Sequence, residues 1–369
     1  MDEHDLSRYS GKTVAVGLSG GVDSSLAAAL LHQAGALVSG ITMKIFKEGA
    51  VPAIAGNLGD ACYGPGEAED IDACAGFCDS LGIPYHVIDL ADEYEERILK
   101  YFRAEYRTGR TPNPCVRCNR DMKFGFMLER ARSAGAEFTF FATGHYARIA
   151  ERNGILHLRR AIDETKDQTY FIHRLAPETL STIVFPLGGM TKNRVRELAQ
   201  ELGLAAAKKP ESQDFVAGGY GSLFDDEAPG DIVDSAGNVL GRHRGIAHYT
   251  IGQRRGIGVS LGPKAMYVAA LDPVKNRVVI SDDASLFSGG LVGSEAFLAD
   301  KRLEGSSVRA QVRIRQNHKP APASVVVSDG RATVRFDLPQ RAVAPGQSAV
   351  FYDGEGFVLG GCIIDAAEK

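Results

Sequence analysis

The sequence predicts an α/β protein: a doubly wound parallel sheet, followed by a small central β domain and a C-terminal β-barrel. Short apolar runs alternate with stretches of helical period as far as residue 204. Beyond residue 210 the helical period stops, and glycine-rich, strand-forming sequence takes over. We therefore expect three domains, at residues 1–212, 213–284 and 285–369.

The composition is that of a folded protein with more than one core. The chain has 369 residues, 44% of them hydrophobic. This length is too great for a single hydrophobic core of ordinary size. No apolar run is long enough to cross a bilayer, and the first eleven residues lack the apolar segment of a secretion signal. We expect a cytoplasmic protein with no membrane partner, whose six cysteines are thiols, metal ligands or redox groups rather than structural disulfides.

The first domain should contain four buried strands and four amphipathic helices. The strands are expected at residues 14–18, 37–43, 85–90 and 138–143. The helices are expected at residues 24–34, 68–81, 93–107 and 124–134. Ligands of such sheets bind at the carboxyl ends of the strands, so residues 17–24, Met43 and 143–146 should share one crevice.

The C-terminal part of the chain consists of short β-type runs separated by turns. They are expected at residues 308–314, 324–327, 332–337, 348–352 and 357–364. Several short strands at this spacing favour a small barrel or sandwich.

Charge is segregated along the chain, although the formal net charge is only −4. Residues 51–110 hold twelve acidic and five basic side chains, whereas residues 301–350 hold nine basic and three acidic ones. The basic segment can be a local face for phosphates or an ordinary solvated surface. Charge alone leaves both interpretations open.

A glycine-rich turn, Ser-Gly-Gly-Val-Asp-Ser at residues 19–24, joins the first expected strand to the first helix. Gly17, Gly20 and Gly21 let the backbone approach an anion closely, and the free N–H groups of a helix start attract negative charge. The Lys-Ser/Thr pair of a Walker loop and the third glycine of a dinucleotide fingerprint are absent. The turn is similar to the pyrophosphate loop of ATP pyrophosphatases, and the alternative is a βα turn without a ligand.

Two cysteines stand three residues apart in a proline-rich stretch. Cys115 and Cys118 follow Thr-Pro-Asn-Pro, and the two prolines predict an exposed loop. Two thiols at this spacing can form a disulfide, bind a metal or hold an iron–sulfur centre. Arg117 and Arg120 should lower the pKa of both thiols.

The other four cysteines give weaker signals. Cys74 and Cys78 stand one helical turn apart and could complete a zinc site, but they share a face with apolar residues, which favours core packing. Cys62 lies in a Gly/Pro-rich loop and Cys362 in a terminal strand, and the sequence assigns neither a role.

Five motifs in order carry a family resemblance: residues 19–24, the Thr-Pro-Asn-Pro stretch with Cys118, Thr-Gly-His-Tyr at 143–146, Lys-Asp-Gln-Thr-Tyr-Phe at 166–171 and Pro-Gly-Gln-Ser-Ala-Val-Phe-Tyr at 345–352. With them the chain resembles, over nearly its whole length, the MnmA family of tRNA-uridine 2-sulfurtransferases. The resemblance implies an ATP pyrophosphatase domain, a central β domain and a C-terminal barrel that together hold a tRNA anticodon arm. It also implies that ATP, with Mg²⁺, adenylates O2 of the wobble uridine before sulfur displaces AMP and gives 2-thiouridine.

The resemblance implies site residues position by position. The ATP contacts would be Gly17, Leu18, Ser19, Gly20, Gly21, Val22, Asp23, Ser24, Met43 and Gly144. The loop that meets the flipped target base would be Asn113, Pro114 and Cys115, since an enzyme acting on a base takes it out of the stack. The tRNA contacts would be His145, Lys166, Asp167, Gln168, Arg315, Gln316 and Gln347. The catalytic residues would be Cys118 and Cys115.

The chain departs from the common family form in its thiols. That form has a second essential cysteine, the persulfide carrier, shortly after a Lys-Lys-x-x-Ser segment, whereas residues 208–217 contain none. Cys115 stands where the common form has aspartate, so it could replace the lost thiol. With that aspartate gone, Asp121 and Asp214 are the candidate general bases.

Two sulfur mechanisms remain open, and both need a sulfur donor or relay protein. In one, Cys115 and Cys118 alternate as persulfide carrier and resolving thiol and end as a disulfide that a reductant reopens. In the other, which we favour slightly, they ligate a [4Fe–4S] cluster with a third ligand such as Cys62, and the free iron carries hydrosulfide.

Other functions also stay open on the sequence. The same loop serves tRNA thiolases that act on another base, and amidoligases or synthetases such as argininosuccinate and NAD synthetases. The paired cysteines and the C-terminal β region argue against a synthetase. A non-catalytic RNA-binding module is a further alternative, and ATP turnover that depends on tRNA would separate these functions.

Overall fold

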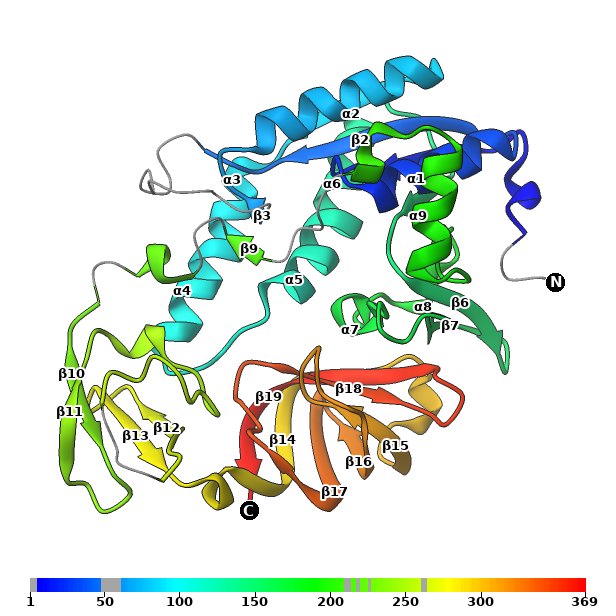
Figure 1. The fold of residues 1–369 in the computed structure, drawn as a ribbon. Helices are drawn as coiled ribbons and strands as arrows, with labels where there is room; N and C mark the ends of the chain where they lie inside the picture. The colour runs from blue at the N-terminus through cyan, green and yellow to red at the C-terminus, as the bar shows by residue number, and fades with distance from the viewer. Residues whose placement is uncertain (1–4, 48–60, 209–213, 217–219, 225–226, 260–263) are drawn as a thin grey trace. The chain divides into compact units, whose positions relative to one another are not determined.

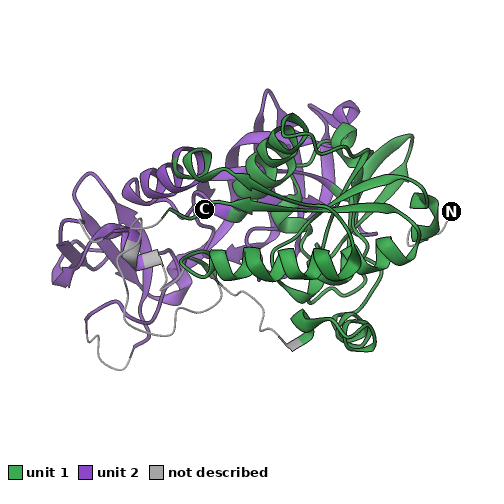
Figure 2. Ribbon diagram, turned by 90° about the horizontal axis from the view of Figure 1, so that it is seen from above, with its two compact units in different colours: residues 1–95, 115–219, 356–358 green, residues 96–114, 220–355, 359–369 purple. Residues whose placement is uncertain are grey.

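A computed structural model describes residues 5–47, 61–208, 214–216, 220–224, 227–259 and 264–369. The chain divides into two compact units, drawn green and purple in Figure 2. Unit 1 comprises residues 1–95, 115–219 and 356–358, and unit 2 comprises residues 96–114, 220–355 and 359–369. The expected domain boundary at residue 212 lies outside the described residues. Unit 2 takes residues 96–114 from the stretch that the sequence assigned to the first domain.

Unit 1 is built on a five-stranded parallel sheet in the order β4-β2-β1-β5-β8, which confirms the predicted fold class. Strand β2 of this sheet is labelled in Figure 1. Its strands are β1 (Thr13–Gly17), β2 (Leu37–Lys44), β4 (Tyr85–Asp89), β5 (Phe140–Thr143) and β8 (Ile183–Val184). The central residues of β1 are fully buried, as expected for a strand covered on both faces. The strand order reverses between β1 and β5, and ligands of such sheets bind at this point, so the loops after these two strands lie where the ligand site is expected.

Two long helices of unit 1 match their predicted positions within two residues: α1 (Val22–Gln33) and α2 (Glu67–Leu81). Cys74 and Cys78 on α2 pack in the same apolar cluster as β1 and β2, so the core-packing interpretation is confirmed. The remaining α-helices of this unit are α3 (Ala91–Tyr94), α5 (Pro114–Arg117, which starts at the last residue of unit 2), α6 (Met127–Ser133), α7 (Thr169–Ile172), α8 (Pro177–Leu180) and α9 (Lys192–Glu201). None of the helices in the described ranges is long and apolar enough to cross a membrane.

Two short β ladders complete the unit: β3 (Ala61–Tyr63) with β9 (Asp214–Val216), and β6 (Ala147–Arg152) with β7 (Ile155–Arg160).

The stretch that carries Cys115 and Cys118 is helical, which corrects the prediction of an exposed loop. Pro114 takes the first position of α5, where the missing N–H of proline costs nothing. The next nine residues, Cys118–Phe126, form a π-helix, a rare conformation that occurs frequently at functional sites. Both thiols are half-buried as a result.

Unit 2 begins with α4 (Lys100–Arg107), whose Tyr106 ring lies 5.3 Å from the ring of Phe224. A four-stranded sheet follows in the order β11-β10-β13-β12, which confirms the predicted small central β domain. Its strands are β10 (Gly230–Val233), β11 (Val239–His243), β12 (Tyr267–Asp272) and β13 (Arg277–Ser281).

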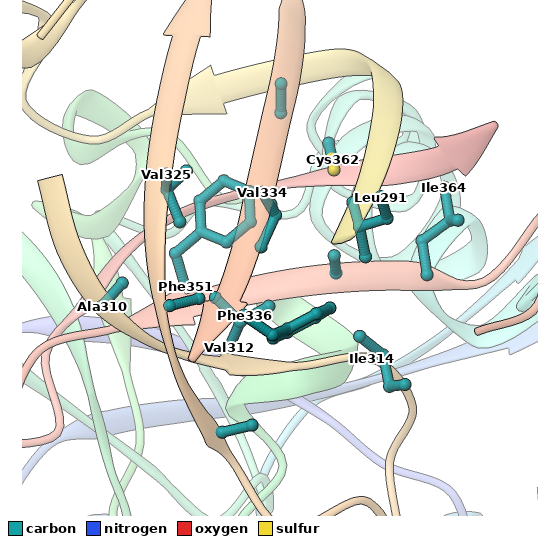
Figure 3. Close-up of a cluster of buried hydrophobic side chains, with 14 of the residues drawn as sticks. Leu291, Ala310, Val312, Ile314, Val325, Val334, Phe336, Phe351, Cys362 and Ile364 are labelled. Atoms are coloured by element: carbon teal, nitrogen blue, oxygen red, sulfur yellow. The ribbon is translucent and has the colours of Figure 1, made fainter. Parts of the chain in front are cut away.

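Six further strands of unit 2 close a barrel in the order β14-β17-β16-β15-β18-β19, so the predicted barrel is confirmed. They are β14 (Phe287–Leu298), β15 (Ser307–Arg313), β16 (Ala321–Ser328), β17 (Arg331–Arg341), β18 (Ser348–Tyr352) and β19 (Val358–Glu368). Side chains such as Leu291, Val334 and Phe351 fill its interior together with Cys362 (Figure 3). The sequence analysis missed β14, because its glycines are typical of a turn. Strand β14 pairs with β17 and β19, including the ends of those strands that the sequence analysis did not assign.

The barrel core yields a stability prediction. Phe351 is 1% exposed, and removing a buried phenylalanine ring costs about 3–5 kcal/mol. We expect Phe351→Ala to lower the free energy of unfolding by about that amount. Leu338→Ala, in the same barrel but 74% exposed, should change it by less than about 0.5 kcal/mol. Urea unfolding followed by circular dichroism measures both, and equal losses would contradict the assigned core.

Candidate functional site

The turn after β1 has the geometry of an anion cradle. Gly20 has a φ of +70°, a left-handed conformation that glycine adopts without strain. Gly21 is the N-cap of α1 and offers no side chain to the N–H groups of the first turn. The Ser24 hydroxyl accepts a hydrogen bond from the Ser19 N–H at 3.2 Å and donates to the Gly21 carbonyl at 3.1 Å. These bonds shape the loop around a helix start, where the dipole attracts phosphate.

Gly144, just after β5, lies directly against this turn. A Cβ at Gly144 would lie 2.7 Å from the carbonyl carbon of Asp23 and 2.7 Å from the nitrogen of Ser24, so only glycine fits. Met43 is half-buried near the carboxyl end of β2, the neighbour of β1. The structure therefore brings residues 17–24, Met43 and Gly144 to one edge of the sheet, and their contact with ATP stays a prediction.

Asp23 has two partners that the sequence analysis missed. Lys192 Nζ donates to both carboxylate oxygens at 2.8 Å, and the Tyr146 hydroxyl donates to Oδ1 at 2.9 Å. Lys192 is 5% exposed, and its ammonium lies 5.6 Å from the centre of the Tyr146 ring. A buried ammonium requires a counterion, so the pair fixes Asp23 in the loop. The only sequence signal was the capped helix start at Thr191, which does not distinguish Lys192 from a surface lysine.

Cys62, Cys115 and Cys118 gather around Tyr94. Burial raises the pKa of the Tyr94 phenol well above its usual value, and the charges of all three thiols raise it further. The three sulfur atoms are therefore within electrostatic reach of one buried hydroxyl. The Tyr94 ring is stacked on Tyr63 at 5.5 Å between ring centres, which ties it to the strand that carries Cys62.

A parallel ladder places the strand that carries Cys62 beside β9 (Asp214–Val216). Strand β3 pairs with β9, with Ala61 opposite Asp214 and Tyr63 opposite Val216. Cys62 is exposed, whereas Cys115 and Cys118 are half-buried. The neighbouring strand thus supplies a thiol where the sequence of β9 supplies none.

The pKa values of Cys115 and Cys118 are raised, which corrects the prediction that nearby arginines lower them. Burial raises the pKa of each thiol to about 12, and the charge of Lys123 counteracts this only in part. Arg120 forms an ion pair with Asp121, with 2.5 Å between Nε and Oδ1, so its charge is already neutralised. Thiols with such pKa values are protonated at neutral pH.

The donor set of this site consists of thiols, the soft ligands that iron–sulfur clusters take. Across the described ranges, no group of three or more His, Cys, Asp or Glu side chains is arranged to hold a metal ion. The chemistry of the three thiols fits a cluster, but they do not form a site for a single ion.

Three residues expected to touch tRNA are used inside unit 1. His145 is buried, shares a 2.7 Å hydrogen bond with Thr143, and burial holds its pKa well below the usual range. Asp167 is 1% exposed and accepts hydrogen bonds from its own loop. Gln168 accepts a hydrogen bond from the Tyr146 N–H at 2.8 Å. The His145 and Asp167 side chains are therefore buried inside unit 1, and their contact with tRNA stays a prediction.

The remaining expected tRNA residues are partly exposed. Lys166, Arg315 and Gln316 are half-buried, and Gln347 donates from its amide to the Thr111 carbonyl at 2.9 Å. Several arginines of the basic segment are ion-paired: Arg302 with Asp300, Arg309 with Asp337 and Arg341 with Asp283. The positive charge counted along the sequence therefore overstates what the surface offers.

Comparison with known families matches three consecutive segments of the chain. Residues 12–217 match the tRNA methyl transferase HUP domain, residues 223–282 the tRNA methyl transferase PRC-barrel domain, and residues 290–364 the aminomethyltransferase beta-barrel domain.

Solved structures resemble part of the chain. NMN synthetase from Francisella tularensis has a TM-score of 0.34 at 15% identity, covering 57% of this chain and 74% of that one. A 4-thiouridine synthetase–RNA complex with bound ATP has a TM-score of 0.30 at 19% identity, covering 57% of this chain and 48% of that one.

Curated relatives match nearly the whole chain. The tRNA-specific 2-thiouridylase MnmA of Synechococcus sp. is 42% identical over 366 residues, covering 96% of this chain and 98% of the relative. Its counterpart from Geobacter metallireducens is 43% identical over 370 residues, covering 96% and 97%. Identity at this level over the full length shows that the chain belongs to the MnmA family of tRNA-specific 2-thiouridylases.

Proposed function

We propose that this protein uses ATP to activate O2 of the wobble uridine in a tRNA anticodon arm and replaces that oxygen with sulfur. The products would be 2-thiouridine, AMP and pyrophosphate. One observation carries the proposal: unit 1 contains both the phosphate cradle at residues 19–24 and the gathered thiols Cys62, Cys115 and Cys118. A synthetase would need the cradle alone, and a binding module would need neither.

The cradle supports the adenylation step through fixed positive charge. Negative charge builds up on the departing pyrophosphate, and preorganised N–H groups and cations lower that barrier. The Lys192 ammonium lies beside the loop and can neutralise this charge. Mg²⁺ prefers carboxylate oxygens, but both Asp23 oxygens are bound by Lys192, so Asp23 would hold the ion only in exchange for this ion pair.

The thiols support the sulfur-transfer step. At a pKa of about 12, Cys115 and Cys118 are poor nucleophiles at neutral pH. Coordination to a metal keeps thiols deprotonated, which favours these two residues and Cys62 as ligands of a [4Fe–4S] cluster. Such a cluster would supply an iron atom that can bind sulfide. The alternative is the persulfide relay through Cys115 and Cys118 alone, and both routes take sulfur from a donor or relay protein.

On the tRNA side, Arg315, Gln316 and Lys166 remain the proposed contacts. They are polar or basic and partly exposed, which suits phosphate or base-edge recognition. We place the reaction in the cytoplasm, where tRNA is modified.

The first functional prediction concerns Lys192. Because its ammonium lies at the phosphate cradle, Lys192→Met should lower tRNA-dependent pyrophosphate release by about 10²–10³-fold. Asp23→Ala and Ser19→Ala should also abolish release, and tRNA affinity should stay nearly unchanged in all three variants. Lys44→Met, which removes an exposed lysine paired with Asp89 at 3.4 Å, is the matched control. Normal release in Lys192→Met would remove Lys192 from the site.

The second prediction separates the two sulfur mechanisms. Cys115→Ser and Cys118→Ser should each eliminate 2-thiouridine, measured by mass spectrometry of digested tRNA, while pyrophosphate release survives in part. With a cluster, Cys62→Ser should lose iron, acid-labile sulfide and thiolation together after anaerobic purification. With a two-thiol relay, it should keep thiolation. Cys362→Ala, in the barrel core, is the control, and full thiolation by Cys115→Ser would contradict both mechanisms.

The third prediction concerns salt. Each phosphate contact that is lost should reduce the slope of log affinity against log salt by about 0.7–0.9. We expect this change, with weaker tRNA binding, for Arg315→Ala and Lys166→Ala. Arg309→Ala should have a smaller effect, because Asp337 already neutralises Arg309. Filter binding at several salt concentrations measures this slope. An unchanged slope would show that Arg315 and Lys166 are ordinary surface residues without phosphate contacts.

A further inference from the structure

In unit 2, the backbone that leads to Asn113 is held by one turn of the barrel. The Thr111 N–H donates to the Pro345 carbonyl at 2.7 Å, and Gln347 Nε2 donates to the Thr111 carbonyl at 2.9 Å. Both backbone polar groups of Thr111 are thus bound by residues 345–347, and Thr111 is only 9% exposed. Residues separated by more than 230 positions in the sequence make this contact.

Gly346 makes the contact possible. Its φ is +91°, which disfavours other residues. A Cβ at this position would lie 2.9 Å from both the nitrogen and the carbonyl carbon of Thr111. The same turn is fixed to β19, because the Gly346 N–H donates to the Ile364 carbonyl and the Ile364 N–H donates to the Gln347 carbonyl, both at 2.8 Å.

Arg110 adds a second attachment between the same two segments. Its Nη2 donates to the Ile364 carbonyl at 3.2 Å and to Asp365 Oδ1 at 3.4 Å, while its Nε donates to Glu105 at 2.7 Å. Two consecutive residues, Arg110 and Thr111, are therefore both hydrogen-bonded to the barrel. The next residues are Pro112, Asn113 and Pro114.

We propose that Arg110 and the turn at residues 345–347 form a clamp that positions Asn113 for the target base. The prolines on either side of Asn113 fix their own φ angles and restrict the residues before them, so a shift at Thr111 is passed on to Asn113. Gln347 and Gly346 are then positioning residues, and Gln347 acts through Thr111 rather than by touching tRNA. The inference rests on the proposed function, in which Asn113 meets the uridine.

Gly346→Ala tests the clamp without changing a side chain that could bind RNA. Its matched control is Gly330→Ala in the same barrel, where φ is +70° and nothing lies within 4 Å of an added Cβ. Both variants carry the same kind of backbone strain, but only Gly346→Ala displaces Thr111. Gln347→Leu, which removes the amide donor at similar volume, is the second variant.

At saturating tRNA and ATP, Gly346→Ala should lower the single-turnover thiolation rate by at least about tenfold, because small misplacements at a reacting centre cost up to about 10²-fold. Gln347→Leu should lower it by about fivefold, the equivalent of one hydrogen bond. The tRNA dissociation constant should stay within twofold for both. Amide hydrogen exchange at Thr111 should accelerate in Gly346→Ala, and Gly330→Ala should match the wild type in every measurement.

The outcomes separate this inference from the function on which it rests. If the wild type does not thiolate tRNA, the proposed function is wrong, whatever the variants do. If the wild type thiolates and Gly346→Ala keeps its rate despite faster exchange at Thr111, the clamp does not position the base loop. If Gln347→Leu weakens tRNA binding and leaves the rate at saturation unchanged, Gln347 is a tRNA contact and the clamp is overturned.

Discussion

The ion pair between Asp23 and the buried Lys192 is the interaction on which the nucleotide site depends. It joins the loop after β1 to the start of α9, and Tyr146 adds a bond from the segment after β5. Leaving the Lys192 ammonium buried and unpaired would be costly, so the loop has a strong reason to keep one conformation. A cradle for phosphate gains from this rigidity, because its N–H groups then need no reorganisation when charge develops.

Burial has a different effect on the thiols, because it suppresses their ionisation. Burial of Cys115 in α5 and of Cys118 at the start of the π-helix raises the pKa of each thiol to about 12 and so suppresses their reactivity as free thiols. Thiols with such pKa values are poor nucleophiles at neutral pH unless a neighbouring group stabilises the thiolate. Cys62 differs from Cys115 and Cys118 in being exposed.

Much of this protein could be predicted from local sequence. The parallel strands, helices α1 and α2, the phosphate loop and most barrel strands follow from hydrophobic period and glycine placement, which are local properties. The predictions that failed concerned properties that depend on the tertiary environment of a residue. Two prolines suggested a loop before Cys115, but one of them starts a helix. Two arginines suggested a lowered thiol pKa, but burial and the Arg120–Asp121 pair decided its direction.

The sequence by itself determined the fold class, the phosphate cradle and the absence of the second family cysteine from residues 208–217, because each is written in neighbouring residues. Only the tertiary structure decided which distant residues complete these sites. Lys192 reaches Asp23 across 169 positions, and Gln347 reaches Thr111 across 236. Strand β3, which carries Cys62, pairs with β9, which lies about 150 positions away in the sequence. Such contacts arise from packing, whose energy depends on surfaces brought together by the whole fold, and no local pattern encodes them.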